Sequence, residues 1–272
     1  MKIVRFLDSG GTPRWGTDFK DGTAVPLAGN LYGSFRKEGY RLPVRRLLAP
    51  AIPRAVFGIG LNYKAHARET GRPFPERPLV FMKNPAALLD PGASIVIPSL
   101  CAGRPQVDYE GELAVVLGRN ARDVPPGEAL DYVLGYTVAN DVSARWWQRE
   151  GSGGQFVRGK SFDTFCPLGP VLVTADEIPD PQALRIRTTL NGQVVQDAGT
   201  GEMIFSVAGL VAELSKGMTL LAGTVILTGT PAGVGAARKP PRFLRAGDLV
   251  QVEIEGIGLL ENPVREEGSP PG

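Results

Sequence analysis

The sequence predicts a mixed, predominantly β fold of barrel or folded-sheet type with short helices, plus a small N-terminal β domain. Two features of the composition predict strands and turns: 35 glycines and 24 prolines among 272 residues, and an aromatic content of only 7%. Short apolar runs bounded by turn residues also outnumber long helical patterns. The length suits one large domain with a small appendage.

The N-terminal domain is expected over residues 1–50. "MKIVRFL", "PRWGTDF" and "GTAVPLA" predict three short strands, separated by the turn-rich segments "DSGGTP" and "KDGT". Residues 35–53 have the character of a connector and end in prolines, so we place a boundary near Ala51. The main domain is expected over residues 51–265, followed by a disordered tail at 266–272.

In the first half of the main domain, "AVFGIGLNY" predicts a buried strand and "KAHARET" a short helical turn. Further strands are expected at "PLVFMKNP", "SIVIP", "DYEGELAVVLG" and "LGYTVAND", with a helical turn at residues 129–134. "VSARWWQRE" predicts a helix. "GSGGQFVRGK" is rich in glycine, which predicts a flexible loop.

In the second half, "GPVLVT" predicts a strand, and "LRIRTTL" with "QVVQDA" predicts a hairpin turning at Asn191 and Gly192. "SVAGLVAELSKG" predicts a helix from the N-cap Ser206 to a stop at Gly217. "GTVILTGTPAGVG" predicts a buried strand that leads into a glycine-rich loop, and "DLVQVEIEGIGLLENPV" predicts a closing hairpin. The chain shows no internal repeat.

The charge balance indicates neither nucleic-acid nor membrane binding, because 30 basic and 28 acidic residues are interspersed and the net charge is +2. The chain contains no apolar run near the roughly 20 residues of a membrane span, and "MKIVRFLDSG" reaches an acid too early for a signal peptide. We therefore expect a cytoplasmic protein. Cys101 and Cys166 are expected to be ordinary reduced thiols.

Two glutamates stand beside an apolar strand in "DYEGELAVVLG". Glu110 and Glu112 are two residues apart, so a strand would point both carboxylates to the same face. A solvated edge strand would explain the pair. Burial next to "LAVVLG" would instead require a compensating cation, and Asp141 ends a nearby strand where it could join them. Three carboxylates would form a site for Mg²⁺ or Mn²⁺.

His66 is the only histidine, and Glu69 lies one helical turn after it, where a carboxylate can orient the imidazole. The prolines that follow indicate a mobile cover over a site. Composition favours an ordinary exposed role for Lys160, although a cation there could hold a carboxylate or an enolate. "TGTPAGVG" lacks the Gly-Lys-Ser/Thr of a phosphate loop; it could bind a substrate carboxylate or form a tight turn.

Six ordered motifs give the chain a resemblance to a known family. "GLNYKAHARETG", "FMKNPAALLDPGASIVIP", "DYEGELAVVLG", "GYTVANDVSARWWQ", "RGKSFDTFCPLGP" and "LTGTPAGVG" resemble the fumarylacetoacetate hydrolase (FAH) family over roughly residues 51–265. Residues 1–50 resemble the small N-terminal domain of some bacterial members. The resemblance implies strands rolled into a barrel-like sheet, a homodimer, and Mg²⁺ or Mn²⁺ as the cofactor.

The resemblance also implies roles for individual residues. One departure is visible, because Trp146 and Trp147 follow the arginine where an acidic residue is common, which puts the neighbouring wall of the site in doubt. The implied roles are metal ligands at Glu110, Glu112 and Asp141, a water-activating pair at His66 and Glu69, an active-site lysine at Lys160, and substrate contacts at Arg145, Gln148 and Thr230.

By resemblance, the chain is an enzyme that cleaves a C–C bond of a 2-oxo acid through a metal-stabilised enolate, as an acylpyruvate hydrolase or an oxaloacetate decarboxylase does. Isomerases or decarboxylases of 2-hydroxymuconate-type compounds and hydratases of oxo-enoates are similar to the same pattern. A catalytically idle protein that binds oxo acids or metal is the non-enzymatic alternative. An idle binder has no need of a base, so His66 and Glu69 favour an enzyme.

Overall fold

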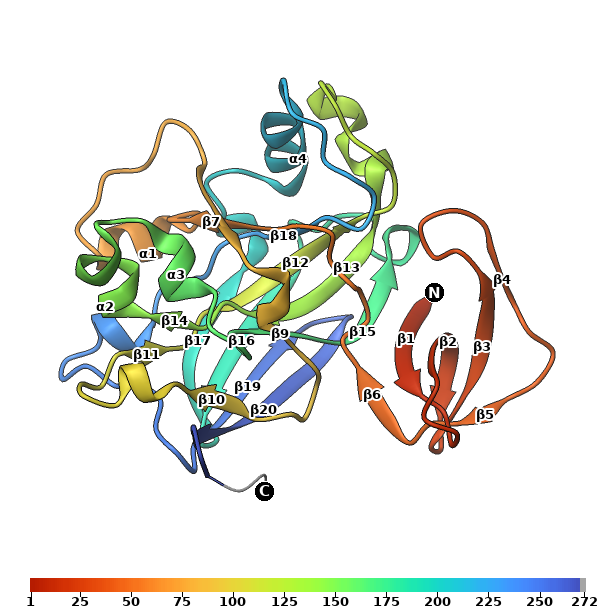
Figure 1. Ribbon diagram of the computed structural model, residues 1–272. Coiled ribbons are helices and arrows are strands. Elements are labelled where there is room, and N and C mark those ends of the chain that lie inside the picture. The colour runs from red at the N-terminus through yellow and green to blue at the C-terminus, as the bar shows by residue number, and fades with distance from the viewer. Residues whose placement is uncertain (270–272) are drawn as a thin grey trace.

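The computed structural model describes residues 1–269 and confirms the mixed, predominantly β fold (Figure 1). Within these residues, strands make up most of the regular structure and the four α-helices are short. The strands form folded sheets of 13, five and two strands. The largest sheet follows the order β4-β3-β2-β1-β15-β13-β12-β18-β7-β8, and the five-stranded sheet follows the order β10-β20-β19-β16-β17.

The N-terminal strands β1 (Lys2–Leu7), β2 (Pro13–Lys20) and β3 (Thr23–Gly29) form the predicted meander. The prediction of a connector at 35–53 is wrong, because this segment contains three more strands that pair with β1 and β3. These strands are too short for a sequence pattern to reveal, and tertiary pairing defines them. They are β4 (Phe35–Lys37), β5 (Leu42–Pro43) and β6 (Arg46–Leu48).

The N-terminal strands continue directly into the main sheet. Strand β1 pairs antiparallel with β15, with Lys2 opposite Val173 and Ile3 opposite Leu172. The red strands in Figure 1 therefore stand beside the main sheet at its β15 edge. The large sheet thus crosses the boundary that we place near Ala51.

Strand β12 (Gly111–Leu117) lies at the centre of the large sheet and is buried along its whole length. It pairs antiparallel with β13 and with β18, and β18 in turn runs parallel to β7. Apolar residues from these strands form the cores on the two faces of the sheet. The remaining strands of the main part of this sheet are β7 (Val56–Gly60), β8 (Leu79–Lys83), β9 (Leu88–Leu89), β13 (Val133–Asn140), β15 (Cys166–Thr174) and β18 (Val225–Leu227).

The five-stranded sheet packs against the same core and contains the predicted hairpin. Asn191 and Gly192 have φ values of 53° and 77°, the left-handed conformation that a two-residue hairpin turn requires. The strands of the two smaller sheets are β10 (Ile95–Ile97), β16 (Arg185–Leu190), β17 (Gln193–Gly199), β19 (Leu249–Ile254), β20 (Gly258–Glu266), β11 (Val107–Asp108) and β14 (Ser143–Ala144).

Helix α4 (Val207–Ser215) confirms the predicted amphipathic helix. The Ser206 hydroxyl accepts a hydrogen bond from the Gly209 N–H at 3.2 Å, and Gly217 leaves the helix with φ of 65°. The 3₁₀ turns are η1 (Pro85–Ala87), η2 (Ser99–Cys101), η3 (Pro126–Tyr132), η4 (Glu150–Ser152), η5 (Ala175–Glu177), η6 (Thr200–Glu202) and η7 (Gly235–Ala237).

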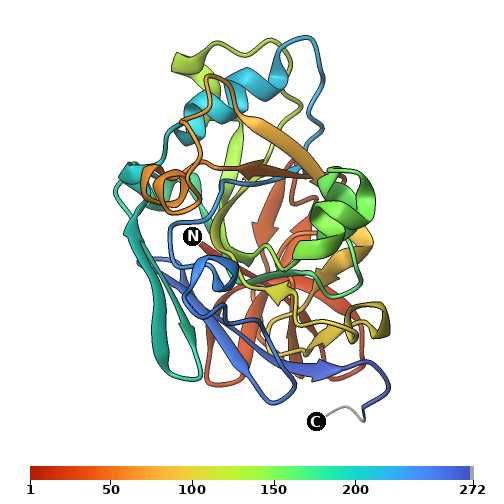
Figure 2. The same ribbon diagram turned by 90° about the vertical axis from the view of Figure 1, so that its left-hand side faces the viewer.

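Three short helices lie at one end of the central strands (Figure 2). The helix α1 (Lys64–Glu69) is the predicted helical turn. The helix expected at 142–150 is shorter, because only α2 (Arg145–Gln148) is α-helical. The prediction of a flexible loop at 151–160 is wrong, since this segment contains the end of η4 and the helix α3 (Phe156–Lys160). The last residue of α3 is buried.

The C-terminal end of the described chain is held to the five-stranded sheet. Strand β20 includes Glu266, and the Glu267 N–H donates to the carbonyl of Ile97 at 2.9 Å. Residues 270–272, the end of the tail expected to be disordered, lie outside the described residues. Within residues 1–269, no helix has both the length and the apolar character needed to cross a membrane.

Gln196 on β17 ties the five-stranded sheet to the start of β12. Its side-chain carbonyl accepts from the Gly111 N–H at 3.0 Å, and its amide donates to the Thr230 hydroxyl at 2.7 Å. The Thr230 hydroxyl in turn donates to the Gly111 carbonyl at 2.9 Å. Gly111 is required here because a Cβ would lie 2.2 Å from the Thr188 hydroxyl. This network fixes the backbone between Glu110 and Glu112.

We expect Gln196→Ala to lower the free energy of unfolding by about 2–4 kcal/mol, because it leaves the buried Gly111 N–H without its partner and opens a small void. Urea denaturation followed by circular dichroism measures this change. Gln193→Ala, at an exposed position of the same strand, is the control and should change stability by less than about 0.5 kcal/mol. Equal effects of the two variants would contradict the role of this network.

Candidate metal centre and active site

Three carboxylates converge where β12 and β13 meet. Gly111 pairs with Asn140, so Glu110 precedes β12 beside the end of β13, where Asp141 follows. The Asp141 N–H donates to the Glu110 carbonyl at 2.8 Å. One carboxylate oxygen from each of Glu110, Glu112 and Asp141 lies within 4.8 Å of the others, and all three residues are buried. The structure thus brings together the three acids that the sequence singles out.

Two buried lysines neutralise part of this acidic cluster. The Lys160 Nζ lies 2.6 Å from Oε2 of Glu110 and 2.5 Å from Oδ2 of Asp141. The prediction from composition that Lys160 is an exposed lysine is therefore wrong, because this residue is only 1% exposed. Lys83, at the end of β8, places its Nζ 2.5 Å from Oδ1 of Asp141. The sequence analysis does not single out Lys83, since nothing near it in the chain indicates an acidic partner.

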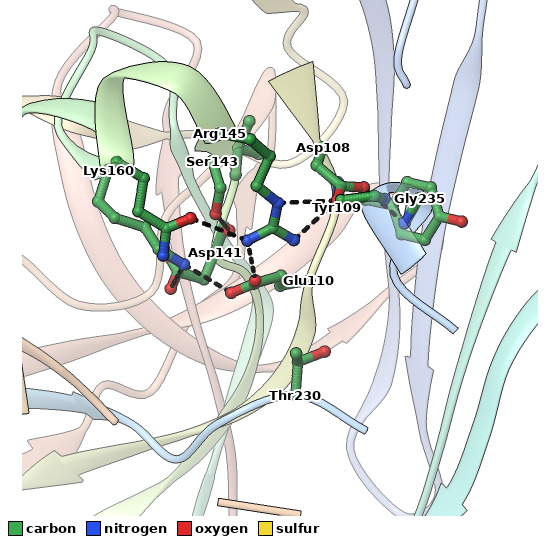
Figure 3. Close-up of polar contacts among 12 residues, drawn as sticks. Asp108, Tyr109, Glu110, Asp141, Ser143, Arg145, Lys160, Thr230 and Gly235 are labelled. Carbon is green, nitrogen blue, oxygen red and sulfur yellow. Dashed lines mark hydrogen bonds and ion pairs between the residues drawn. The ribbon is translucent and has the colours of Figure 1, made fainter. Parts of the chain in front are cut away.

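Arg145 links the cluster to a fourth buried acid, Asp108 (Figure 3). Its Nε and Nη2 donate to Oδ2 of Asp108 at 2.8 and 2.7 Å, and its Nη1 donates to Oε1 of Glu110 at 2.6 Å. Nη1 also donates to the side-chain carbonyl of Gln148 at 3.1 Å. Arg145 thus holds Glu110 in place. A direct substrate contact for Arg145 and Gln148 stays a prediction.

Burial and neighbouring charges act in opposite directions on the two glutamates. Burial opposes the ionisation of Glu110, but Lys160 and Arg145 overcome it and lower the pKa of this carboxyl. For Glu112, burial and the nearby Asp141 and Glu110 together raise the pKa well above its ordinary value. Burial also opposes the charged form of Lys160, yet Asp141 and Glu110 raise its pKa. Glu112 is therefore the acid of the cluster whose charged form is least compensated by its surroundings.

This arrangement fits a hard divalent cation. All three donors are carboxylate oxygens, the ligand type that Mg²⁺ and Mn²⁺ prefer. Among residues 1–269, the one hydrogen bond to the Glu112 carboxylate comes from the Gly229 N–H at 2.6 Å, so this side chain retains acceptor capacity. A bound cation would also supply the positive charge that Glu112 lacks. The buried triad can therefore bind a metal.

His66 and Glu69 form the predicted pair on α1. The His66 Nδ1 lies 3.1 Å from Oε2 of Glu69, and Oε1 of Glu69 accepts from the Gly233 N–H at 2.9 Å. A protonated Nδ1 donating to Glu69 leaves Nε2 as the basic atom. Asn62 anchors the start of α1, because its amide donates to the carbonyl of Thr228 at 2.7 Å.

Two acids of the triad, Glu110 and Glu112, line one cavity of about 390 Å³ together with Lys160 and His66. Helix α2 presents Arg145 and Gln148 to it, as residues one helical turn apart do, and Arg149 directly after the helix lines it as well. Trp146 and Trp147 are not among its lining residues; their rings pack edge-on with centroids 4.8 Å apart. The two tryptophans at which the sequence departs from the family pattern therefore lie outside the wall of this cavity. The lining includes Thr230, Glu110, Glu112, Lys160, His66 and Glu69.

Sequence reasoning missed Asp108 and Arg149 as well as Lys83. Asp108 stands two residues before Glu110, where strand alternation could have placed it with the two glutamates. Its carboxylate accepts from the Gly235 and Ala236 N–H groups at 2.8 and 2.9 Å, so it also holds the loop after β18. Arg149 could have been found from its position four residues after Arg145.

Comparison with known proteins places this β-rich chain with its buried acidic centre in one family. Residues 55–265 match the family model "Fumarylacetoacetate (FAA) hydrolase C-terminal", and residues 1–50 match "Rv2993c-like, N-terminal". The chain belongs to the fumarylacetoacetate hydrolase family of enzymes.

Several relatives in this family are named oxaloacetate tautomerases. "Oxaloacetate tautomerase fahd2, mitochondrial" from Xenopus laevis is 48% identical over 219 residues, covering 80% of this chain and 68% of the relative. "Oxaloacetate tautomerase FAHD2A, mitochondrial" from Homo sapiens is 46% identical over 218 residues, with the same coverage of 80% and 68%.

Solved structures extend the similarity to the whole chain. A 5-carboxymethyl-2-hydroxymuconate delta-isomerase from Mycobacterium smegmatis superimposes with a TM-score of 0.85 at 40% identity, covering 98% of this chain and 100% of that one. A 2-hydroxyhepta-2,4-diene-1,7-dioate isomerase from Mycobacterium marinum gives a TM-score of 0.84 at 39% identity, covering 99% and 100%.

We expect Glu112→Gln to raise the melting temperature of the metal-free protein at pH 7–8. Because the pKa of Glu112 is raised in the folded state, protonation of this side chain stabilises the folded protein at low pH. That stabilisation is lost as the pH rises through the folded-state pKa. Glutamine removes the repulsion from Asp141 and Glu110 and can still accept from Gly229. The gain should shrink as the pH falls toward about 4.5, where unfolded glutamates take up protons.

Calorimetric melting in the presence of a chelator, at several pH values, measures this difference. Glu128→Gln, which changes an exposed glutamate, is the matched control and should leave the melting temperature unchanged. A Glu112→Gln variant that melts below the wild type at pH 7–8 would contradict the conclusion that Glu112 is the least compensated acid of the cluster.

Proposed function

We propose that this chain is a divalent-metal-dependent enzyme that forms the enol or enolate of a 2-oxo acid by moving a proton at the carbon beside the keto group. The observation that carries the proposal is a buried carboxylate triad whose two glutamates line one cavity with a histidine held by a carboxylate. The relatives named oxaloacetate tautomerase and the structures named as isomerases support it, because both names describe proton shifts on 2-oxo or 2-hydroxy-enoic acids.

Glu110, Glu112 and Asp141 would hold the ion, for which we propose Mg²⁺ or Mn²⁺. The bound ion supplies Lewis-acid stabilisation of negative charge on the substrate oxygens. Arg145 is a positioning residue in this scheme, because it fixes Oε1 of Glu110 while Lys160 fixes Oε2. The two contacts define the direction in which the Glu110 carboxylate faces the cavity.

His66 is the proposed acid–base residue. Glu69 orients the ring through Nδ1, so Nε2 can take a proton from the substrate carbon and return it. Lys160 lines the same cavity and carries a buried positive charge, which favours the developing enolate oxygen. Thr230, held by Gln196 and Gly111, presents its side chain on another part of the wall and is proposed to contact the substrate carboxylate.

C–C bond cleavage, of the acylpyruvate hydrolase or oxaloacetate decarboxylase type, is the second candidate function. The His66–Glu69 pair favours it as well, since the same Nε2 could deprotonate a water that attacks a distal carbonyl. Decarboxylation would need no such water. The names of the relatives favour the proton shift, and the family membership is compatible with either reaction.

A substrate panel with Mg²⁺ separates these reactions. Tautomerisation changes the enol absorbance of oxaloacetate, cleavage of an acylpyruvate releases pyruvate, and decarboxylation of oxaloacetate releases CO₂. We expect the change in enol absorbance to be the fastest process. Pyruvate or CO₂ formed at an equal or higher rate would instead assign the chain to C–C cleavage.

We expect His66→Ala to lower kcat for the proton shift by about 100- to 10,000-fold, the usual contribution of a general acid–base residue. Its affinity for Mn²⁺, measured by calorimetric titration, should stay within about twofold of the wild type, because His66 is not one of the three proposed ligands. Unchanged turnover in this variant would support an idle binding protein or a base other than His66.

Glu110→Ala should abolish both Mn²⁺ binding and turnover, because it removes one of three ligands and leaves Lys160 and Arg145 without a shared partner. The same titration and a turnover assay measure both effects. Retained Mn²⁺ affinity would contradict the proposed ligand set. Circular dichroism of the variant shows whether the loss reflects unfolding, and Glu110→Gln provides a milder change of the same ligand.

The homodimer and the separate N-terminal domain stay proposals. Strand β8 ends the large sheet, and its Val80 and Met82 are 43% and 41% exposed, which supports a partner chain at this edge. Some relatives are named as mitochondrial proteins, so the cytoplasmic location of this chain stays a prediction.

A further inference from the structure

Two arginines of the cavity wall differ from the other cations of the site. Arg145 and Lys160 are buried and engaged by carboxylates. Arg72 and Arg149 also line the cavity, yet within residues 1–269 neither side chain forms an ion pair or a side-chain hydrogen bond. Both are exposed to solvent. The cavity therefore offers two guanidinium groups that no acid among the described residues neutralises.

The two arginines come from segments that are separate in sequence. Arg72 follows α1, and its N–H donates to the Ala67 carbonyl at 2.9 Å, which fixes its backbone to the helix that carries His66. Arg149 follows α2, whose Arg145 holds Glu110. In Figure 2, α1 (orange) and the green helices α2 and α3 lie on either side of the central strands. One free cation of the cavity wall thus comes from the segment after α1 and the other from the segment after α2.

Apolar side chains complete the wall of this cavity. Leu79, Phe81, Phe156 and Ile59 line it together with the two glutamates of the triad and the two arginines. A substrate whose 2-oxo acid group lies at the triad would therefore share this cavity with apolar side chains and two free guanidinium groups. Guanidinium groups bind carboxylates through paired, charge-assisted hydrogen bonds. This combination matches a short carbon chain with an anionic group at each end.

We propose that Arg72 and Arg149 form a subsite for the distal carboxylate and so select dianionic 2-oxo acids over monoanionic ones. This inference rests on the proposed function and names the substrate class of the same site. The proximal carboxylate and keto oxygen lie at the metal triad, and the distal carboxylate pairs with the two arginines. Because Arg72 adjoins α1, occupation of the subsite also fixes the segment that carries the acid–base pair.

Exchange of the hydrogens beside the keto group for deuterium, followed by NMR in D₂O with Mg²⁺, tests this selectivity. Oxaloacetate and 2-oxobutanoate are the substrates, because they differ only in a distal carboxylate replaced by a methyl group. The variants are Arg72→Gln, Arg149→Gln and the double variant. Arg119→Gln, at an exposed position outside the cavity lining, is the matched control.

We expect each single variant to lower kcat/KM for oxaloacetate about tenfold and the double variant about 100-fold, mainly through KM, as the loss of charge-assisted hydrogen bonds does. For 2-oxobutanoate the same variants should change kcat/KM by less than about threefold, and Arg149→Lys should recover part of the oxaloacetate activity. Calorimetric titration with oxalate, which has no distal group, should give an unchanged Kd.

Two results would overturn the subsite: equal losses for both substrates, or no loss for oxaloacetate in the double variant. Wild-type enzyme that exchanges oxaloacetate and 2-oxobutanoate equally well would also refute the selectivity while leaving the proposed function intact. Wild-type enzyme that exchanges neither substrate would refute the proposed function itself. These results are distinguishable in one data set.

Discussion

The buried carboxylates at the junction of β12 and β13 are the constraint on which the rest of the site depends. Taking an isolated carboxylate out of water costs several kcal/mol unless a cation or hydrogen bonds compensate. The surrounding chain supplies those cations from separate elements: Lys83 from the end of β8, Arg145 from α2 and Lys160 from α3. Helices of four and five residues are not stable alone, so these ion pairs help to determine where α2 and α3 lie.

Strand register and one polar bridge then give the acids their geometry. Pairing of Gly111 with Asn140 sets Glu110 beside Asp141, and Gln196 fixes Gly111 from the second sheet. The loop after β18 completes the arrangement, because its Gly229 N–H holds Glu112 and its Gly233 N–H holds Glu69. The carboxylate triad and the His66–Glu69 pair therefore share one support, and a shift of this loop would disturb both.

The sequence predicts those parts of the molecule whose causes are local. The Glu-x-Glu pair, the capped helix α4 and the Asn-Gly hairpin each carry their signal within a few residues, and the structure contains each of them. Lys83 and α3 could not be predicted in this way. Lys83 lies 58 residues before its partner Asp141, and α3 forms in a glycine-rich segment because Lys160 reaches two buried acids. Tertiary ion pairing overrides local propensity at both places.

Charge balance connects the triad with the two free arginines. With every group in its charged form, as metal binding at Glu112 would require, the four acids and three bases of the buried centre leave one negative charge. These groups are Asp108, Glu110, Glu112, Asp141, Lys83, Arg145 and Lys160. Each oxygen of Glu110 and Asp141 already accepts from one cation but has a second lone pair free. A dication would change the balance to one positive charge, which a single substrate carboxylate would neutralise. A second carboxylate would then need cations outside the centre, and Arg72 and Arg149 are cavity-lining cations without an acidic partner among the described residues.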